Sequence, residues 1–584
     1  MATLRAEVRR IVRGVKRRAR KRFRRLRARL PGGQPAGASP QSPITGPQGV
    51  VEVFTNREIV GWVAVQSEAP PVRVALRVNQ VEVTSTWAID TINLNSWGEV
   101  RGFRIALYDL WRYCKKSDRV GVRAGERTLP IVQKGMFYRP PRNGAETLAE
   151  LKTRLAEGHV FGQTGRLQLS KTLDIEWQNT VMRLYNRVRA LVRRDFGYDV
   201  FFCYGTLLGA VRDNGFIGHD VDFDAAYISK HSDGQAAARE LQDIAFMLIE
   251  EGLQVKCMRT ALHIYPDESP TARVDLFHLY FDADEKLAFP FGIAGTIEMP
   301  LDHWTDVREV EFGGGRGLIP VNAEALTEHI YGPNWRIPQP GFSWSRDRTR
   351  RAREGILPVA WVDEVYWANF YAHTSYSSGS PFFEAVNAIP DLPKTVIDIG
   401  CGEGRDSYAF AEAGRWVLGL DRCEVGIRHA EAKAPGLVRT GALEFVTCDV
   451  GDADAFRSVL SEAIAKARDE PIMFYLRFFL HAVPADIQDV AMAVLSECAR
   501  DGDYFAAEFR TDKDELKPKA HGKHYRRFQN GPAFGARLQD EYRFKILVER
   551  EGIGMSPYRS EDPELYRVVA RREPGMTGEG VADR

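Results

Sequence analysis

Three aspartates occupy alternate positions near the middle of the chain, in the stretch Asp220-Val-Asp222-Phe-Asp224. Residues two apart in an extended strand share one face, so the three carboxylates are expected to point the same way. Such carboxylates repel one another unless a divalent cation is present. Mg²⁺ in proteins characteristically takes one or two carboxylates together with substrate phosphate oxygens. The run therefore predicts a Mg²⁺ or Mn²⁺ site that handles a phosphate.

Further candidates flank this run. Gly205 and Thr206 follow an apolar strand and form a turn where backbone can approach a phosphate closely. Asp275 lies in a second buried-strand pattern and could stand beside the first carboxylates. Arg212 offers a fork of donors suited to phosphate, and an ion pair with one of the aspartates is the alternative. The other interpretations of the acidic run, a polar edge strand or a calcium loop, are disfavoured by its apolar flanks.

This region resembles the LicD/fukutin family of phosphotransferases, which have a nucleotidyltransferase fold. The resemblance covers 170–345 and rests on Gly-Thr-Leu-Leu-Gly-Ala-Val-Arg at 205–212, Gly-Phe-Ile at 215–217, the aspartate run, Val274-Asp275, and Tyr331-Gly332, Trp335 and Pro338. Two positions depart from the family pattern: His219 replaces the usual Trp, and Val221 stands where many members have Asp. The resemblance implies transfer of a phosphate-linked group, of the phosphocholine or alditol phosphate type, from a CDP-activated donor to a sugar or lipid-linked glycan.

The expected roles follow from this resemblance. Asp222 and Asp224 would hold Mg²⁺ (or Mn²⁺) against the diphosphate, so that charge on the leaving CMP is neutralised. Asp220 or Asp275 would complete the metal shell or take the proton of the acceptor hydroxyl, and the sequence does not divide these roles. The predicted metal ligands are Asp222, Asp224 and Asp275.

A glycine-rich turn marks a second candidate site. An apolar strand carrying Asp398 runs into Gly400, Gly402 and Gly404, followed by a helix and by a strand that ends at Asp421. Strands at 443–447 and 472–476 then follow, the first of them leading to Asp449. Strand, glycine turn, helix, strand and terminal acid in this order form a nucleotide-binding crevice on a parallel sheet. An NAD-binding Rossmann fold is the competitor, but it prefers a different glycine spacing.

Residues 365–572 resemble the class I methyltransferases that use S-adenosylmethionine. The resemblance implies that Asp398 and the glycines lie at the methionine moiety, Asp421 on the ribose hydroxyls and Asp449 near the adenine. A hydroxyl acceptor needs a base, and the candidates are His481 and Glu508, with a packed core histidine as the alternative for His481. The basic segment 521–527 could hold an anionic acceptor or be a solvated loop; its candidate residues are His524, Arg526 and Arg527.

The chain of 584 residues is therefore expected to be a multidomain protein. It should comprise an N-terminal basic amphipathic helix, a small β-sandwich, an α+β nucleotidyltransferase-like domain and a C-terminal α/β Rossmann-like methyltransferase. The predicted boundaries are 1–30 for the helix, 31–49 for a flexible linker, 50–137 for the β-sandwich, 138–169 for a helical connector, 170–345 for the LicD-like domain, 346–364 for a linker, 365–572 for the methyltransferase and 573–584 for a tail.

The net charge of +2 hides an asymmetry, because residues 1–30 carry +13 and the remainder carries −11. Apolar residues in the basic segment recur at a spacing of three and four, which predicts a helix that lies on an anionic membrane surface. The alternatives are a solvated basic tail, a tail that binds nucleic acid and an organellar presequence. Seven scattered cysteines indicate a reducing compartment. We expect a cytoplasmic protein held peripherally at the inner face of the plasma membrane, without a spanning segment or signal peptide.

These observations favour a bifunctional enzyme of cell-surface polysaccharide or glycoconjugate biosynthesis. One domain would attach a phosphate-linked group, and the other would methylate the glycan or its substituent. The first alternative is an enzyme that modifies RNA or nucleotide ends, although the body is acidic and shows no nucleic-acid-binding motif, which makes a nucleic-acid partner unexpected. The second alternative is a noncatalytic membrane-associated scaffold, which would require losses in both motif sets.

Overall fold

The computed structural model describes residues 48–574, apart from gaps at 66–68, 95–97, 267–271, 296–297, 341, 343, 345–349, 353, 375, 520–524 and 559–560. The predicted basic helix 1–30, most of the predicted linker, nearly all of the predicted tail and His524 lie outside the described residues. No helix in the described part of the chain is both long and apolar enough to cross a membrane.

The first unit is a β module made of two four-stranded antiparallel sheets, in the orders β1-β2-β6-β5 and β4-β3-β7-β8. Val51, Val74 and Val122 illustrate its core, in which apolar residues from both sheets meet. Its strands are β1 (Gln48–Phe54), β2 (Glu58–Ala64), β3 (Val72–Val78), β4 (Val81–Ala88), β5 (Asp90–Leu94), β6 (Gly98–Ala106), β7 (Val120–Ala124) and β8 (Arg127–Leu129).

The predicted helical connector at 138–169 is only partly helical. It contains α2 (Leu148–Ala156), which begins with a capping box between Thr147 and Glu150, and then a hairpin of β9 (His159–Phe161) and β10 (Leu167–Leu169). Apolar side chains of both parts join the core of the β module. The segment thus belongs to that module instead of connecting two others, because its short apolar runs are buried on the module's core.

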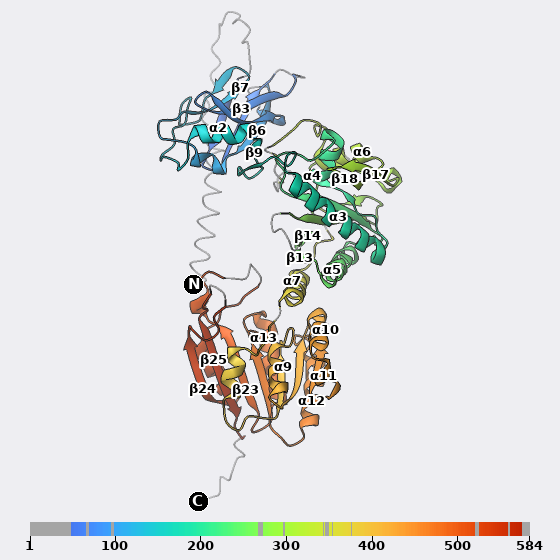
Figure 1. Ribbon diagram of the computed structural model, residues 1–584, viewed down its shortest axis with the longest axis vertical. Helices are drawn as coiled ribbons and strands as arrows, with labels where there is room; N and C mark the ends of the chain where they lie inside the picture. The colour runs from blue at the N-terminus through green and yellow to red at the C-terminus, as the bar shows by residue number, and fades with distance from the viewer. Residues whose placement is uncertain are drawn as a thin grey trace, which may run out of the picture.

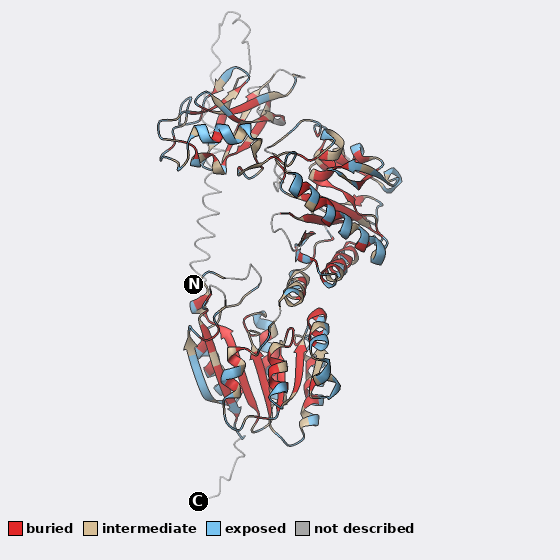
Figure 2. Ribbon diagram, viewed as in Figure 1, coloured by how far each residue is buried: buried red, intermediate tan, exposed pale blue. Residues whose placement is uncertain are grey.

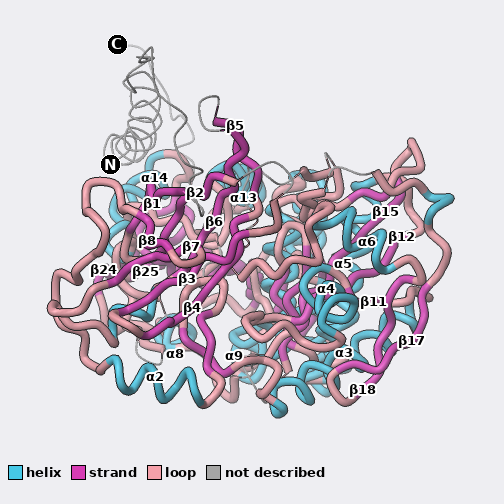
Figure 3. The backbone as a smooth tube through the Cα atoms, turned by 90° about the horizontal axis from the view of Figure 1, so that it is seen from above, coloured by secondary structure: helices cyan, strands magenta, loops and turns pink. Residues whose placement is uncertain are grey.

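The second unit is built on a six-stranded mixed sheet, ordered β11-β12-β15-β14-β13 with β16 beside β15. Strands β12 and β15 run parallel at its centre, and α3 and α5, which contact each other, both pack against β15. Figure 3 shows these elements from above. The elements are α3 (Ile175–Phe196), β11 (Phe201–Phe202), α4 (Tyr204–Leu208), a π-helix (Gly209–Asp213), β12 (Phe223–Ser229), α5 (Gly234–Glu250), β13 (Gln254–Cys257), β14 (Ala261–Tyr265), β15 (Val274–Phe281), β16 (Leu287–Ala288), the hairpin β17 (Val307–Phe312) and β18 (Gly315–Pro320), and α6 (Ala323–Tyr331).

Helix α3 shows how the sequence sets these elements. Asp174 caps its N-terminus by accepting a hydrogen bond from the Trp177 amide, and Gly197 ends it in the left-handed conformation. Its apolar face, formed by Leu184, Val188, Leu191 and Val192, is buried. Figure 2 shows the same division across the molecule: strands are mainly buried, whereas helices keep exposed outer faces.

The third unit is a seven-stranded sheet in the order β21-β20-β19-β22-β23-β25-β24, in which β25 runs antiparallel to its neighbours. Its elements are α8 (Pro381–Asn387), β19 (Thr395–Ile399), α9 (Arg405–Glu412), β20 (Trp416–Asp421), α10 (Glu424–Lys433), α11 (Pro435–Arg439), β21 (Leu443–Thr447), α12 (Ala453–Ala467), β22 (Ile472–Arg477), α13 (Ala485–Cys498), β23 (Tyr504–Arg510), α14 (Gly531–Asp540), β24 (Phe544–Gly552) and β25 (Leu565–Arg572). The predicted strands are present, and the chain reverses direction across the sheet between β21 and β22, beside β19.

Helix α7 (Val359–His373) lies between the second and third units (Figure 1). It contacts α5 and β13 on one side and α10 on the other. Val365 and Ala368 of α7 are buried in the core of the second unit. The helix begins inside the segment 346–364 predicted as a linker, because several of its apolar and aromatic residues pack, buried or partly buried, against the hydrophobic core.

Candidate active sites

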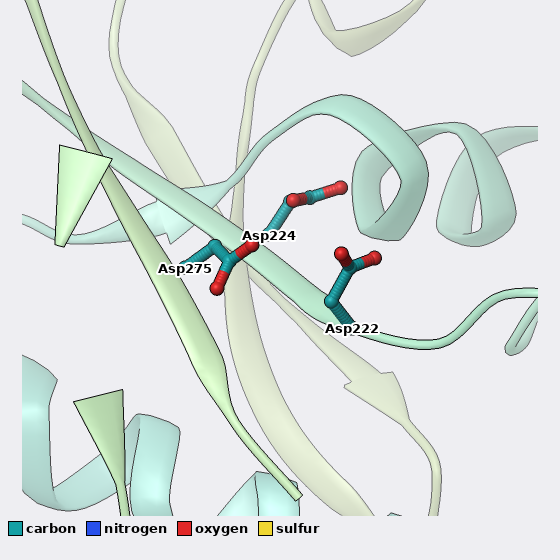
Figure 4. Close-up of side chains that lie close together, drawn as sticks. All are labelled: Asp222, Asp224 and Asp275. Atoms are coloured by element: carbon teal, nitrogen blue, oxygen red, sulfur yellow. The ribbon is translucent and has the colours of Figure 1, made fainter. Parts of the chain in front are cut away.

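The predicted carboxylate cluster forms, but not on one strand. Strand β12 begins at Phe223, so Asp220 and Asp222 lie in the loop before it and only Asp224 lies on the strand. Asp275 is the register partner of Asp224 on the parallel strand β15. Asp222, Asp224 and Asp275 each present a carboxylate oxygen within 4.8 Å of the others. Figure 4 shows two of these side chains coming from one segment and the third from the neighbouring strand.

The cluster concentrates negative charge where water is scarce. Burial, followed by repulsion from Asp222, raises the pKa of both Asp220 and Asp224 well above the ordinary range. The same two causes raise the pKa of Asp275 to about 7, against an opposing attraction from Arg273. A divalent cation would offset this repulsion, and oxygen donors at such spacing are the ligands that Mg²⁺ or Mn²⁺ requires. The residues therefore fit the predicted metal.

Arg273 is a member of the cluster that the sequence interpretation overlooked. Its Nε donates to Asp275 Oδ1 at 2.8 Å, and its Nη2 donates to Asp222 Oδ2 at 2.6 Å. This guanidinium links the loop to β15 and partly neutralises the negative charge of the carboxylates. The signal was available, because Arg273 precedes Asp275 by two positions in an extended segment and so shares its face.

The expected Gly-Thr turn is instead the short helix α4. The Gly205 amide donates to Asp224 Oδ2 at 2.9 Å, and the Thr206 hydroxyl accepts from the Asp224 amide at 2.8 Å. Both residues thus position a predicted metal ligand, and their contact with a phosphate stays a prediction. Position 205 has no room for a side chain, since an added Cβ would lie 2.5 Å from Asp220 Oδ2.

The cluster opens into a cavity of about 480 Å³. Arg212 lines it and pairs with Asp213 at 2.7 Å, not with a carboxylate of the cluster. The role of Arg212 as a phosphate clamp stays a prediction. The wall also has an aromatic part, formed by Phe277, Phe291, Tyr331, Trp335, Phe342 and Trp344. Charged and aromatic walls together suit a ligand with phosphate and ring components.

The glycine-rich turn of the third unit lies where its sheet predicts a ligand. In doubly wound sheets, ligands bind outside the carboxyl ends of strands where the chain reverses direction, here at β19 and β22. Gly400, Gly402 and Gly404 follow β19, and all have φ between 58° and 78°, a region that favours glycine. Asp421 fixes the turn, because its carboxylate accepts from the Gly402 and Cys423 amides, each at 2.9 Å.

The other predicted cofactor residues lie at the same edge of the sheet. Asp398, near the end of β19, is buried and accepts from the Ser407 hydroxyl at 2.6 Å, and burial raises its pKa to about 7. Asp449 follows β21 and is exposed. Tyr371 of α7 also reaches this edge, since a Cβ at Gly402 would lie 2.5 Å from its ring. Contact of these residues with a cofactor stays a prediction.

Glu508 is not placed as the expected base. Its side chain is fully buried on β23, between its register partners Arg477 on β22 and Arg567 on β25. Arg567 Nε donates to Glu508 Oε2 at 2.5 Å, and the Ser556 hydroxyl donates to the same carboxylate. This carboxylate is an ion-pair partner within the sheet and has no open face toward an acceptor, which corrects its assignment as a base.

The structure favours the packed alternative for His481. This residue is 5% exposed, and its Nδ1 accepts from the Arg510 amide at 3.3 Å. Arg526 and Arg527 are described and half-buried. Arg527 donates through its side chain to Gln488 and through its amide to the His481 carbonyl. These bonds indicate that Arg527 ties a loop to the domain, whereas an acceptor-binding role for Arg526 stays a prediction.

Comparison with known protein families matches one segment of the chain. Residues 197–322 match the family described as LicD/FKTN/FKRP, nucleotidyltransferase domain. These residues include α4, the aspartate loop, β12 and β15, and therefore the whole carboxylate cluster. A search of curated proteins finds no match to the chain.

Two of the solved structures similar to part of the chain are described as methyltransferases. One from Anabaena variabilis is 16% identical, with 37% of this chain and 96% of that chain covered and a TM-score of 0.30. The magnesium protoporphyrin IX methyltransferase of Synechocystis, solved with bound S-adenosylmethionine, is 17% identical, with 37% and 82% covered and a TM-score of 0.23. The chain thus contains a segment similar to the LicD family, at residues 197–322.

Proposed function

We propose that the protein is a bifunctional transferase that builds cell-surface glycans. The second unit would transfer a phosphate-linked group from a CDP-activated donor to a sugar, and the third unit would methylate the glycan or that group. The observation that carries the proposal is the three-carboxylate cluster on β12, on β15 and in the loop before β12, which lies within the LicD-matched segment. Paired carboxylates beside a phosphate-binding arginine suit phosphoryl transfer.

Each charged residue at the cavity would have its own role in the transfer reaction. Asp222, Asp224 and Asp275 would hold Mg²⁺ or Mn²⁺, which when bound neutralises charge on the diphosphate. Arg212 would bind a donor phosphate, and the aromatic wall would hold the ring of the donor. Asp220 is the remaining carboxyl at the cavity and has a raised pKa. It is therefore suited to take the proton of the acceptor hydroxyl.

Methyl transfer would occur at the glycine-rich turn. S-adenosylmethionine supplies the methyl group, and an in-line approach of the acceptor is the main geometric requirement. Asp421 holds the turn in shape through two amides, and the turn lies at the carboxyl ends of β19 and β22, where ligands of such sheets bind. The membrane arm at 1–30 would bring both sites to lipid-linked glycans, in the cytoplasm at the inner face of the plasma membrane.

Mass spectrometry of the surface glycan tests this proposal directly. Cells that lack the protein should lose both a phosphate-linked substituent and a methyl group from the same glycan. Complementation with Asp224→Asn should restore only methylation, provided that methylation does not require the substituent. An unchanged glycan would contradict the proposal. Thermal stabilisation of the purified protein by S-adenosylmethionine should accompany the result, because a ligand that binds the folded state stabilises it.

A further inference from the structure

The hairpin formed by β9 and β10 lies outside the LicD-matched segment but reaches its cavity. Gln163, at the tip of this hairpin, lines the same cavity as His219, Asp220 and Asp222. Figure 1 shows β9 on the side of the β module that faces α4. The wall of the phosphotransferase cavity is therefore built from two structural units.

The hairpin is fixed to the β module. Phe161 and Leu167 pack on the module's core. The Leu167 amide donates to Asp109 Oδ2 at 3.0 Å, and the Asp109 amide donates to the Gly165 carbonyl at 2.9 Å. Gly165 has a φ of 78°, and a Cβ there would lie 2.3 Å from the amides of residues 107 and 108. This close contact and these hydrogen bonds hold the hairpin in a fixed position on the β module.

The same hairpin also fixes the loop that carries the aspartates. Gln168 Nε2 donates to the Asp220 carbonyl at 2.7 Å, and the Lys171 amide donates to the Gly218 carbonyl at 2.9 Å. Gly218 itself packs closely on the Ser170 side chain, since a Cβ there would lie 2.5 Å from Ser170 Oγ. Because Asp222 precedes β12, its position depends on this loop as well as on its ion pair with Arg273 beside β15.

We propose that the β9–β10 hairpin makes the β module a working part of the phosphotransferase site. Gln168 is a positioning residue, because its amide holds the loop that presents Asp222 to the metal. Gln163 contacts the sugar or alditol hydroxyls of the bound substrate. Its uncharged carboxamide offers both hydrogen-bond donors and an acceptor, which suits hydroxyl groups. The phosphates would instead be bound by Arg212. This inference rests on the proposed metal-dependent transfer.

Titration of the full chain with Mn²⁺, followed through the electron paramagnetic resonance of the free ion, tests the role of Gln168. Gln168→Ala and Gln168→Glu should both weaken Mn²⁺ binding by about 10-fold, the loss typical of residues that support metal ligands. Arg166→Ala is the matched control, because Arg166 lies on the same hairpin and stacks on Tyr108 of the β module. This control should bind Mn²⁺ as the wild type does.

A role of Gln168 limited to folding would lower the melting temperature and leave Mn²⁺ affinity unchanged, and that outcome overturns the inference. Gln163→Ala should bind Mn²⁺ normally but raise the KM for the transferred or accepting polyol in an assay with CDP-glycerol or CDP-ribitol. An unchanged KM overturns the assignment of Gln163. If wild-type protein binds no Mn²⁺, the proposed transfer fails and the inference fails with it. Normal wild-type binding with unaffected Gln168 variants rejects the inference alone.

Discussion

The substitution Gly205→Ala is expected to disturb the carboxylate site while leaving the fold nearly as stable as in the wild type. The added Cβ would lie 2.5 Å from Asp220 Oδ2 and 3.1 Å from Asp224 Oδ2. Comfortable contacts between heavy atoms begin at roughly 3.5 Å, so the nearer oxygen must move by about 1 Å. A misplacement of about 1 Å can cost 10²-fold in rate. We therefore expect kcat/KM for transfer to fall about 100-fold.

The same substitution should cost little stability. Gly205 lies in helix α4 with an ordinary φ, and alanine is favoured over glycine in a helix by up to about 1 kcal/mol. This gain opposes the strain of the displaced carboxylate. The melting temperature should therefore stay within about 4 °C of the wild type, the shift expected from roughly 1 kcal/mol in a domain of this size.

The assay measures CMP release from a CDP donor alongside a thermal melt. Gly215→Ala is the matched control, because it lies just after the π-helix and a Cβ there meets nothing within 4 Å. It should retain wild-type turnover. Wild-type turnover by Gly205→Ala would refute the reasoning that Asp220 and Asp224 must keep their positions. Loss of folding in that variant would refute the energy balance.

Three further predictions concern the third unit. Gly402→Ala should abolish thermal stabilisation by S-adenosylmethionine, since the added Cβ would lie 2.5 Å from the Tyr371 ring. Gly414→Ala is the control, because Gly414 also has a positive φ but a Cβ there meets nothing within 4 Å, and this variant should bind S-adenosylmethionine normally. Glu508→Gln should lower the free energy of unfolding by about 1.5–3 kcal/mol in chemical denaturation, because it removes the charged partner of the partly buried Arg567. A neutral effect would count against the ion-pair assignment. Burial raises the pKa of Asp398 to about 7, so its favourable contribution to stability is complete below about pH 4 and is lost as the pH rises to 7. Asp398→Asn should show a smaller loss of melting temperature from pH 5 to pH 8 than the wild type, and an equal loss would contradict this.

Much of the carboxylate site could be predicted because its residues are close in sequence or lie on recognisable strands. Alternating aspartates and a second buried strand were enough to predict the cluster of Asp222, Asp224 and Asp275. The expectation that all three aspartates share one face of a strand was only partly right, since the strand begins at Phe223 and only Asp224 lies on it. Hydrophobic alternation does not mark the first residue of a strand when loop and strand have the same pattern.

The errors arose where tertiary contacts decide the outcome. Glu508 is enclosed because Arg477 and Arg567 are its register partners, and strand register is not visible in a single sequence. Gln163 and Gln168 belong to a hairpin that docks on another unit, and no local motif marks them. Helix α7 was divided by a predicted boundary because its aromatic residues pack on two domains.

The central claim is that the carboxylate cluster catalyses a metal-dependent transfer from a CDP-activated donor. The most direct test is CMP release from CDP-choline, CDP-glycerol and CDP-ribitol, measured with an extracted glycan acceptor and Mg²⁺. We predict release from one of these donors by the wild type, and none with excess chelator or with Asp224→Asn. Release that persists in the chelator or in Asp224→Asn, or no release from any donor, would contradict the claim.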